Sequence, residues 1–205
     1  MTKINTIIFD LGGVLIDWNP EYVFLNAFNG DKEKTKWFLD NVCTMEWNEN
    51  QDAGYPLKRA TEDLVKKFPE YKNYIEMYYG NWENMLGGAI DGTVKILSKL
   101  IKDNNYKVVA LTNWSAETFP IAQKHYKFLN WFEGIVVSGE EGTRKPHQKI
   151  YEIILKRFNI NPQNALFIDD NLKNIEAANK LKINGIHFKN PEQLTSELKS
   201  YNIYL

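Results

Sequence analysis

The chain has 205 residues, a formal net charge of −1 and a hydrophobic content of 43%. This length fits one large domain or a core with a smaller second domain, and the apolar fraction suffices for a packed core. The near-neutral charge gives no electrostatic reason to expect nucleic acid or an anionic membrane as a partner. The start lacks the apolar segment of a signal peptide, no apolar run is long enough to span a bilayer, and the single cysteine, Cys43, cannot form an internal disulfide. We therefore expect a cytoplasmic protein.

The first predicted element is a short buried strand over residues 7–9 that ends at an acid, Asp10. A run this short and rich in β-branched residues is typical of a strand inside a sheet. Open parallel sheets bind ligands beyond the carboxyl ends of their strands, where Asp10 would lie. Gly12 and Gly13 then allow a tight turn and a close approach of the backbone to a ligand. The alternative is that Asp10 only caps a junction between strand and loop.

Residues 17–89 show helical patterns and no clear strand pattern. Pro20 can open the first helix, and apolar residues recur at helical spacing in four successive segments. These residues are Val23, Phe24, Ala27 and Phe28; Trp37, Phe38 and Val42; Leu57, Ala60, Leu64 and Phe68; and Tyr71, Ile75, Tyr78 and Tyr79. We therefore expect a helical-bundle cap at 17–89, inserted into a core formed by 1–16 and 90–205.

From Asp91 onward the predicted helices and strands alternate. The helices lie around residues 94–101, 119–126, 149–158 and 175–181, and the strands over 106–111, 134–137, 165–168 and 185–188. Alternation with short apolar strands predicts an α/β fold, in which a parallel sheet is covered by helices on both faces. The expected core is a three-layer, Rossmann-like structure.

Polar residues follow four of the predicted strands. Besides Asp10 they are Thr112 with Asn113, Lys145 before Pro146, and Asp169 with Asp170. In a parallel sheet these strand ends share one edge, so we expect the side chains to converge.

The acid pair Asp169 and Asp170 suits a metal ion. Carboxylate oxygens without His or Cys nearby favour Mg2+, which one or two carboxylates and a substrate phosphate usually hold. The alternative is that one acid caps the helix starting near Leu172.

Lys145 could neutralise a phosphate oxygen or be a solvated surface lysine. Thr112 could donate to phosphate or cap the following helix.

With these groups in this order, the whole chain resembles the haloacid dehalogenase-like (HAD) hydrolases that carry a helical cap after the first strand. The resemblance lies in four motifs: residues 9–15 (FDLGGVL), 111–113 (LTN), 145–146 (KP) and 167–171 (FIDDN). It implies a phosphatase in which Asp10 forms an aspartyl-phosphate that water then hydrolyses.

The resemblance also implies site roles. Mg2+ would be held by Asp10, the backbone carbonyl of Gly12 and Asp170, with Asp169 nearby. Lys145, together with Thr112 and Asn113, would bind the phosphoryl group. Electrostatics supports these roles, because Mg2+ and Lys145 would remove the repulsion between a carboxylate nucleophile and a phosphate dianion.

One departure from the family pattern concerns Gly12. Family phosphatases usually carry there a second Asp that acts as general acid and base. The leaving group could need little protonation, a cap residue such as Glu46 or Asp52 could replace the acid, or the chain could be a non-catalytic phosphate-binding relative. The subgroup with glycine here includes sugar-1-phosphate phosphatases, to which the resemblance is strongest. A metal-independent 2-haloacid dehalogenase is the rival enzyme, although Asp169 and Asp170 argue against it.

The polar segment 44–54 of the expected cap could contact a substrate. Its Asn and Gln side chains would bind sugar hydroxyls, and Trp47 would stack on a sugar ring. Glu46, Trp47 and Asp52 are the expected substrate contacts. The alternative is a loop between helices with Trp47 buried in the bundle. The expected substrate is a small phosphorylated metabolite, a sugar phosphate first, and the expected state is a monomer or homodimer.

Overall fold

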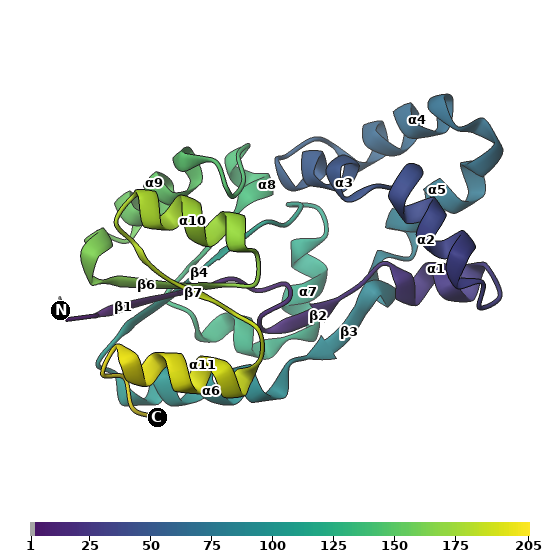
Figure 1. The fold of residues 1–205 in the computed structure, drawn as a ribbon. Coiled ribbons are helices and arrows are strands. Elements are labelled where there is room, and N and C mark those ends of the chain that lie inside the picture. Colours follow the sequence, from purple (N-terminus) through teal and green to yellow (C-terminus); the bar gives the residue numbers. More distant parts are fainter. Residues whose placement is uncertain (1–2) are drawn as a thin grey trace.

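A computed structural model describes residues 3–205, so the first two residues of the expected core lie outside it. At its centre is a five-stranded parallel sheet with strand order β5-β4-β1-β6-β7 (Figure 1). The strands are β1 (Thr6–Phe9), β4 (Lys107–Thr112), β5 (Ile135–Val137), β6 (Ala165–Asp169) and β7 (Asn184–His187). The predicted α/β fold with a parallel sheet is confirmed.

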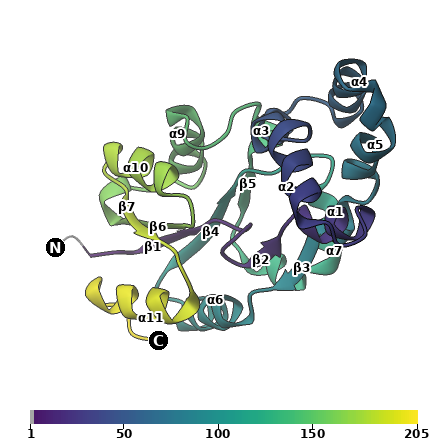
Figure 2. The ribbon, with the colours of Figure 1, turned by 45° about the vertical axis from the view of Figure 1, so that its right-hand side comes forward.

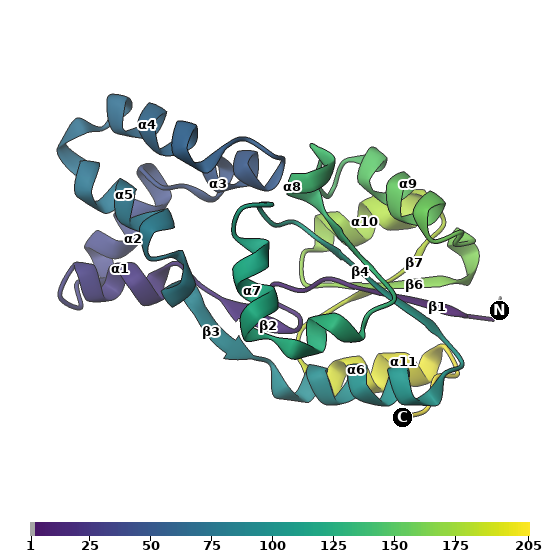
Figure 3. The same cartoon turned by 180° about the vertical axis from the view of Figure 1, so that it is seen from behind.

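Alternate residues of the central strands face two separate apolar layers. In β1, Ile7 and Phe9 pack into one layer and Ile8 into the other, as the period of two of a strand requires. Figures 1 and 3 show which helices cover each face. One face carries α6 (Asp91–Asp103), α7 (Phe119–His125) and α11 (Pro191–Ser200), and the other carries α9 (Gln148–Arg157) and α10 (Leu172–Lys180).

A helical unit lies at the carboxyl end of the sheet, away from the N-terminus (Figures 1 and 2). It consists of α1 (Glu21–Ala27), α2 (Lys32–Asn41), α3 (Met45–Asp52), α4 (Leu57–Lys67) and α5 (Lys72–Gly80). Its interior is largely aromatic, with the Phe24 ring 4.9 Å from Phe38 and 6.0 Å from Tyr78. The division into a cap at 17–89 and a core at 1–16 and 90–205 stays a prediction.

Two features of this region differ from the sequence-based expectation. The prediction that residues 17–89 contain no strand was wrong. The strand β2 (Ile16–Trp18) pairs antiparallel with β3 (Leu86–Ala89) where the chain enters and leaves the helical unit. These strands are too short, and Gly87 and Gly88 too weakly strand-forming, to give a recognisable pattern. The segment 44–54 is also mostly helix rather than loop, since Thr44 caps α3 by accepting a hydrogen bond from the Trp47 amide at 3.1 Å.

The remaining helices are short. They are α8 (Ser138–Glu141) and the 3-10 turns at Pro69–Tyr71, Trp82–Met85, Lys127–Trp131 and Pro162–Asn164. Within residues 3–205, no helix has both the length and the apolar character needed to cross a bilayer.

Candidate active site

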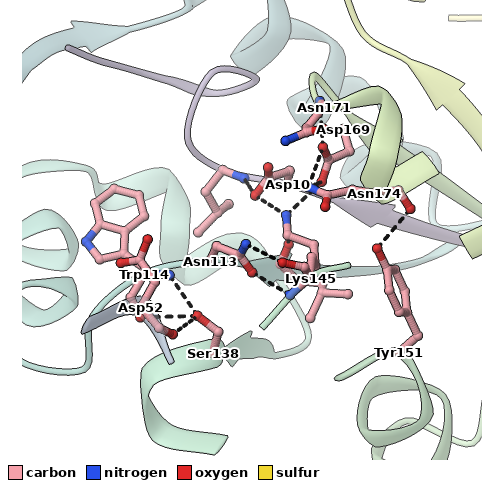
Figure 4. Close-up of polar contacts among 12 residues, drawn as sticks. Asp10, Asp52, Asn113, Trp114, Ser138, Lys145, Tyr151, Asp169, Asn171 and Asn174 are labelled. Atoms are coloured by element: carbon pink, nitrogen blue, oxygen red, sulfur yellow. Dashed lines mark hydrogen bonds and ion pairs between the residues drawn. The ribbon is translucent and has the colours of Figure 1, made fainter. Parts of the chain in front are cut away.

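Asp10 and Lys145 meet at the carboxyl edge of the sheet (Figure 4). Asp10 directly follows β1, and its carboxylate Oδ1 lies 2.8 Å from Lys145 Nζ and accepts a hydrogen bond from the Leu11 amide at 2.7 Å. Both contacts use Oδ1, and among residues 3–205 no group donates to Oδ2 of Asp10. One oxygen of this carboxylate is therefore fixed, while the other is available to a ligand.

Lys145 is buried and not a solvated surface lysine, with only 1% of its surface exposed. Its ammonium donates to Asp169 Oδ2 at 2.7 Å and to the Leu111 carbonyl at 3.0 Å, in addition to its ion pair with Asp10. Burial lowers the pKa of this amine, but Asp10 and Asp169 outweigh that effect and raise it above its ordinary value. Lys145 is thus held in place by two carboxylates, which favour its charged form.

The two neighbouring acids after β6 have different surroundings. Asp169 is fully buried, and its oxygens accept hydrogen bonds from Lys145, the Asn171 amide (2.8 Å) and the Asn174 side chain (3.0 and 3.1 Å). Asp170 is exposed to the site and lies against Gly13. Neither acid caps the next helix, because Asn171 does so by accepting a hydrogen bond from the Lys173 amide at 3.0 Å.

Three carboxylates lie together beside one ammonium group. Single oxygens of Asp10, Asp169 and Asp170 all lie within 4.8 Å of one another. Burial raises the pKa of Asp10 well above its usual value, Lys145 opposes this rise, and the two other acids add to it. The pKa of Asp170 is also raised, by burial and then by Asp169. This excess of negative charge, on oxygen ligands only, fits a hard divalent cation such as Mg2+.

Asn113 and Thr112, which follow β4, are placed differently from each other. The Asn113 side chain accepts a hydrogen bond from the Lys145 amide at 2.8 Å and donates to its carbonyl at 3.0 Å, so it fixes the backbone that carries the ammonium. The Thr112 hydroxyl is buried, has no hydrogen-bond partner within residues 3–205 and does not line the cavity described below. Thr112 is also not a cap, since α7 begins only at Phe119.

A cavity of about 300 Å³ opens between this edge of the sheet and the helical unit. Its sheet side includes Asp10, Gly12, Asn113, Lys145 and Asp170. Its other side is formed by polar residues of α3, by Met45 and by aromatic rings, namely Asn48, Glu49, Asp52, Trp18, Tyr79 and Trp82. The sequence-predicted residues at the sheet edge thus converge on this cavity, apart from Thr112 and the buried Asp169, which contacts Lys145 but does not line the cavity.

Of the three residues predicted to contact a substrate from the helical unit, the structure brings only Asp52 to the cavity. Glu46 and Trp47 point elsewhere on α3 and line a separate hollow beside α2 and α4. Trp47 packs against Tyr78 and Tyr79, with ring centroids 5.1 and 5.3 Å apart. Trp47 thus packs within the bundle, away from the cavity that contains Asp10, and its stacking on a sugar ring stays a prediction.

Several residues in and around the cavity were not anticipated. Arg144 forms an ion pair with Glu49 at 2.6 Å and also donates to the Lys145 carbonyl at 3.0 Å, which links the loop that carries Lys145 to α3. Residues 45, 48, 49 and 52 follow the spacing of one helical face. This spacing is visible in the sequence, but only once the segment is recognised as a helix.

The fold and this cluster of acids around a buried lysine define a class of hydrolase. Residues 4–182 match the haloacid dehalogenase-like hydrolases, and the chain belongs to this family. It is 34% identical over 231 residues to the glyceraldehyde 3-phosphate phosphatase of Pyrococcus furiosus, covering 100% of this chain and 90% of that one. It is 26% identical over 201 residues to the sesquiterpene phosphatase astK of Aspergillus oryzae, covering 97% and 96%.

Solved structures show the same fold. A HAD family enzyme of Bacteroides thetaiotaomicron, crystallised as a magnesium complex, superposes with a TM-score of 0.71 at 21% identity, over 97% of this chain and 100% of that one. The chain is therefore an enzyme of the HAD hydrolases, and its relatives include named phosphatases.

Proposed function

We propose that this enzyme is a Mg2+-dependent phosphatase that hydrolyses small phosphate monoesters through phosphorylated Asp10. The observation that carries the proposal is the convergence of Asp10, Lys145 and Asp170 in one cavity. A carboxylate with one fixed and one available oxygen is suited to nucleophilic attack. A fixed ammonium 2.8 Å away offsets the charge that repels a phosphate dianion.

The ion would be held by Asp10 and Asp170, with the backbone carbonyl of Gly12 as the third protein ligand. Asp169 lies nearby, but its oxygens are already engaged by Lys145 and by two asparagine groups, so it acts mainly by orienting Lys145. When bound, Mg2+ would supply positive charge to the phosphoryl oxygens. Asn113 would serve the same centre indirectly, by fixing the Lys145 backbone, and would contact the phosphoryl group only through its remaining hydrogen-bonding capacity.

The charges around the cavity favour a substrate whose organic part is uncharged. Among residues 3–205, Lys145 is the one cation that lines the cavity, and it is paired with Asp10 and Asp169. Arg144 lies next to the cavity and is paired with Glu49. A second phosphate or a carboxylate on the substrate would meet Glu49 and Asp52 without a free positive partner. Amide, carboxylate and aromatic groups together suit hydroxyls on a small carbon skeleton. We therefore infer a sugar phosphate, and a sugar 1-phosphate first.

Two relatives are named for phosphates of this kind. Glyceraldehyde 3-phosphate and a sesquiterpene phosphate both carry an uncharged organic part. The monomeric or homodimeric state and the cytoplasmic location stay predictions.

The test is phosphate release from para-nitrophenyl phosphate, acetyl phosphate and a panel of sugar phosphates, with Mg2+ and with chelator. We expect turnover only with Mg2+, and its loss in Asp10→Asn, which keeps the size of the side chain and removes the nucleophile. Full activity of Asp10→Asn would refute the proposal. Failure to turn over every phosphate would favour a phosphate-binding relative, and halide release from a 2-haloacid in chelator would favour a dehalogenase.

A further inference from the structure

One face of α3 forms the wall of the cavity opposite Asp10. Met45, Asn48, Glu49 and Asp52 line it, at the three- and four-residue spacing of a single helical face. Glu46 lies on another face of the same helix and is exposed. Of the two acids considered as a replacement for the side chain missing at Gly12, only Asp52 therefore lines the cavity that contains Asp10.

Hydrogen bonds to the ends of two core strands fix the position of Asp52. Ser138, which follows β5, donates from its hydroxyl to the Asp52 backbone carbonyl, and it accepts from the Trp114 amide at 2.9 Å (Figure 4). Trp114 lies two residues beyond the end of β4. Asn48 donates to Asp52 Oδ2 at 3.2 Å. The carboxyl group is thus held relative to the sheet, and not only relative to its own helix.

The other cavity acids are committed elsewhere. Glu49 is paired with the Arg144 guanidinium at 2.6 Å. Asp10 and Asp170 belong to the acid cluster at the sheet edge. Asp52 makes no ion pair within residues 3–205, so its carboxyl group is the one that can exchange a proton with a ligand in the cavity.

We propose that Asp52 is the general acid and base of this enzyme, acting from α3 in place of the side chain that Gly12 lacks. This inference rests on the proposed phosphatase function and extends it by assigning the proton transfer. It also explains how an enzyme with glycine two residues after its nucleophile could hydrolyse substrates with poor leaving groups.

The surroundings of Asp52 suit an acid that works near neutral pH. The pKa of its carboxyl group is raised to about 7, mainly by burial and to a smaller extent by Glu49 on the same helix. Arg144 and Lys145, from the loop after α8, and the backbone of Ser115, from the loop after β4, lower it. A group with this pKa is protonated in a useful fraction of molecules and can also lose its proton.

Each proton transfer accompanies a change in the bonds to phosphorus. Asp10 Oδ attacks phosphorus, and the bond from phosphorus to the ester oxygen breaks with its electron pair on that oxygen. Asp52 gives its proton to this oxygen, which leaves as an alcohol. The Asp52 carboxylate then takes a proton from water as the water oxygen attacks phosphorus. The bond to Asp10 breaks, inorganic phosphate leaves, and both residues return to their starting states.

The test compares leaving groups in Asp52→Asn, with Glu46→Gln as the matched change on the other face of α3. The readout is kcat/KM, which reports the steps up to formation of the phosphoenzyme. For alkyl and sugar phosphates we expect Asp52→Asn to lower kcat/KM by about 10²–10⁴-fold, the usual size of general acid-base help. Para-nitrophenyl phosphate needs no proton, so its kcat/KM should change by less than about threefold. Glu46→Gln should show no dependence on the leaving group.

A second readout tests whether Asp52 has the raised pKa that this role requires. Since the Asp52 pKa is raised in the folded state, its ionisation destabilises the fold as pH rises from about 4 to about 7. The Tm of Asp52→Asn relative to the parent should therefore increase between pH 5 and pH 8.

Equal loss on aryl and sugar phosphates, no loss on either, or a leaving-group effect in Glu46→Gln would overturn the assignment of Asp52. A Tm difference that does not change with pH would also overturn it. Failure of the phosphatase proposal looks different, because the parent enzyme would then release no phosphate from para-nitrophenyl phosphate.

Discussion

Gly12 and Gly13 follow the same strand end, but a methyl group would meet different surroundings at each. At Gly12 no heavy atom lies within 4 Å of an added Cβ. At Gly13 the backbone has φ +71°, which side-chain-bearing residues rarely adopt, and an added Cβ would collide with the Asp170 carboxylate. The second glycine therefore permits the close approach of Asp170, whereas the first leaves open space in the cavity.

Alanine at each position tests this difference. Gly13→Ala should lower the free energy of unfolding by about 1–3 kcal/mol, the usual cost of backbone strain, and should remove Mg2+-dependent activity by displacing Asp170. Gly12→Ala should change stability by less than about 0.5 kcal/mol, as at an unconstrained site. Denaturant unfolding and phosphate release measure the two effects. Equal destabilisation by both substitutions would contradict the assigned surroundings.

At this scale the sequence predicted the kinds of residue in the site better than their partners. Lys145 was placed at the sheet edge from the order of the motifs, but its contacts with Asp169 and the Leu111 carbonyl depend on the fold. Asn113 was expected to bind phosphate, whereas its amide group holds the Lys145 backbone. Pairing across loops that are more than thirty residues apart is set by tertiary packing, which no local pattern encodes.

Most helices and strands of the core were predictable because each has a clear hydrophobic period. The helix α3 has no such period, since one of its faces lines a cavity and another is exposed, and it was not predicted. The helix α11 near the C-terminus was also not predicted, although its buried residues Leu194 and Leu198 lie one helical turn apart. The ribbon of β2 and β3 is held by pairing between segments about seventy residues apart, and each segment alone has no strand signal.

The attachment of α3 to the core can be measured through the ion pair between Arg144 and Glu49. These side chains are 19% and 37% exposed, so the pair is less screened than one on the open surface. A double-mutant cycle with Arg144→Gln and Glu49→Gln should give a coupling energy of about 1 kcal/mol in unfolding.

The i,i+4 pair of Lys36 and Asp40 on α2 is the control. With 74% and 55% exposure, it should couple more weakly than the pair of Arg144 and Glu49, as exposed helix pairs do. Urea denaturation at low salt gives both energies. A coupling at Arg144 no larger than this control would show that the pair does not hold α3 against the sheet.

In the whole molecule, the site lies between the sheet and the helical unit, whose buried apolar residues form one continuous cluster with one face of the sheet. The sheet edge contributes Asp10, Lys145 and Asp170, and the helical unit contributes Asp52 and Tyr79. The chain passes between the parts through the β2–β3 ribbon (Figure 2). We expect movement about this ribbon to admit substrate and to exclude water when the cavity is filled. Ligands should consequently stabilise the molecule as a whole.

Mg2+ provides the simplest measure of that linkage, because the three acids repel one another when no cation is bound. An ion that binds only the folded state at a hundredfold excess over its Kd adds about 2.7 kcal/mol of stability, so Tm should rise with Mg2+ and return with chelator. The Tm of Asp170→Asn should depend on Mg2+ differently from that of the parent. Without Mg2+ it should melt above the parent, since one repelling charge is gone, and with Mg2+ it should gain little. A parent Tm that does not respond to Mg2+, or an equal response in Asp170→Asn, would mean that these carboxylates do not hold the ion.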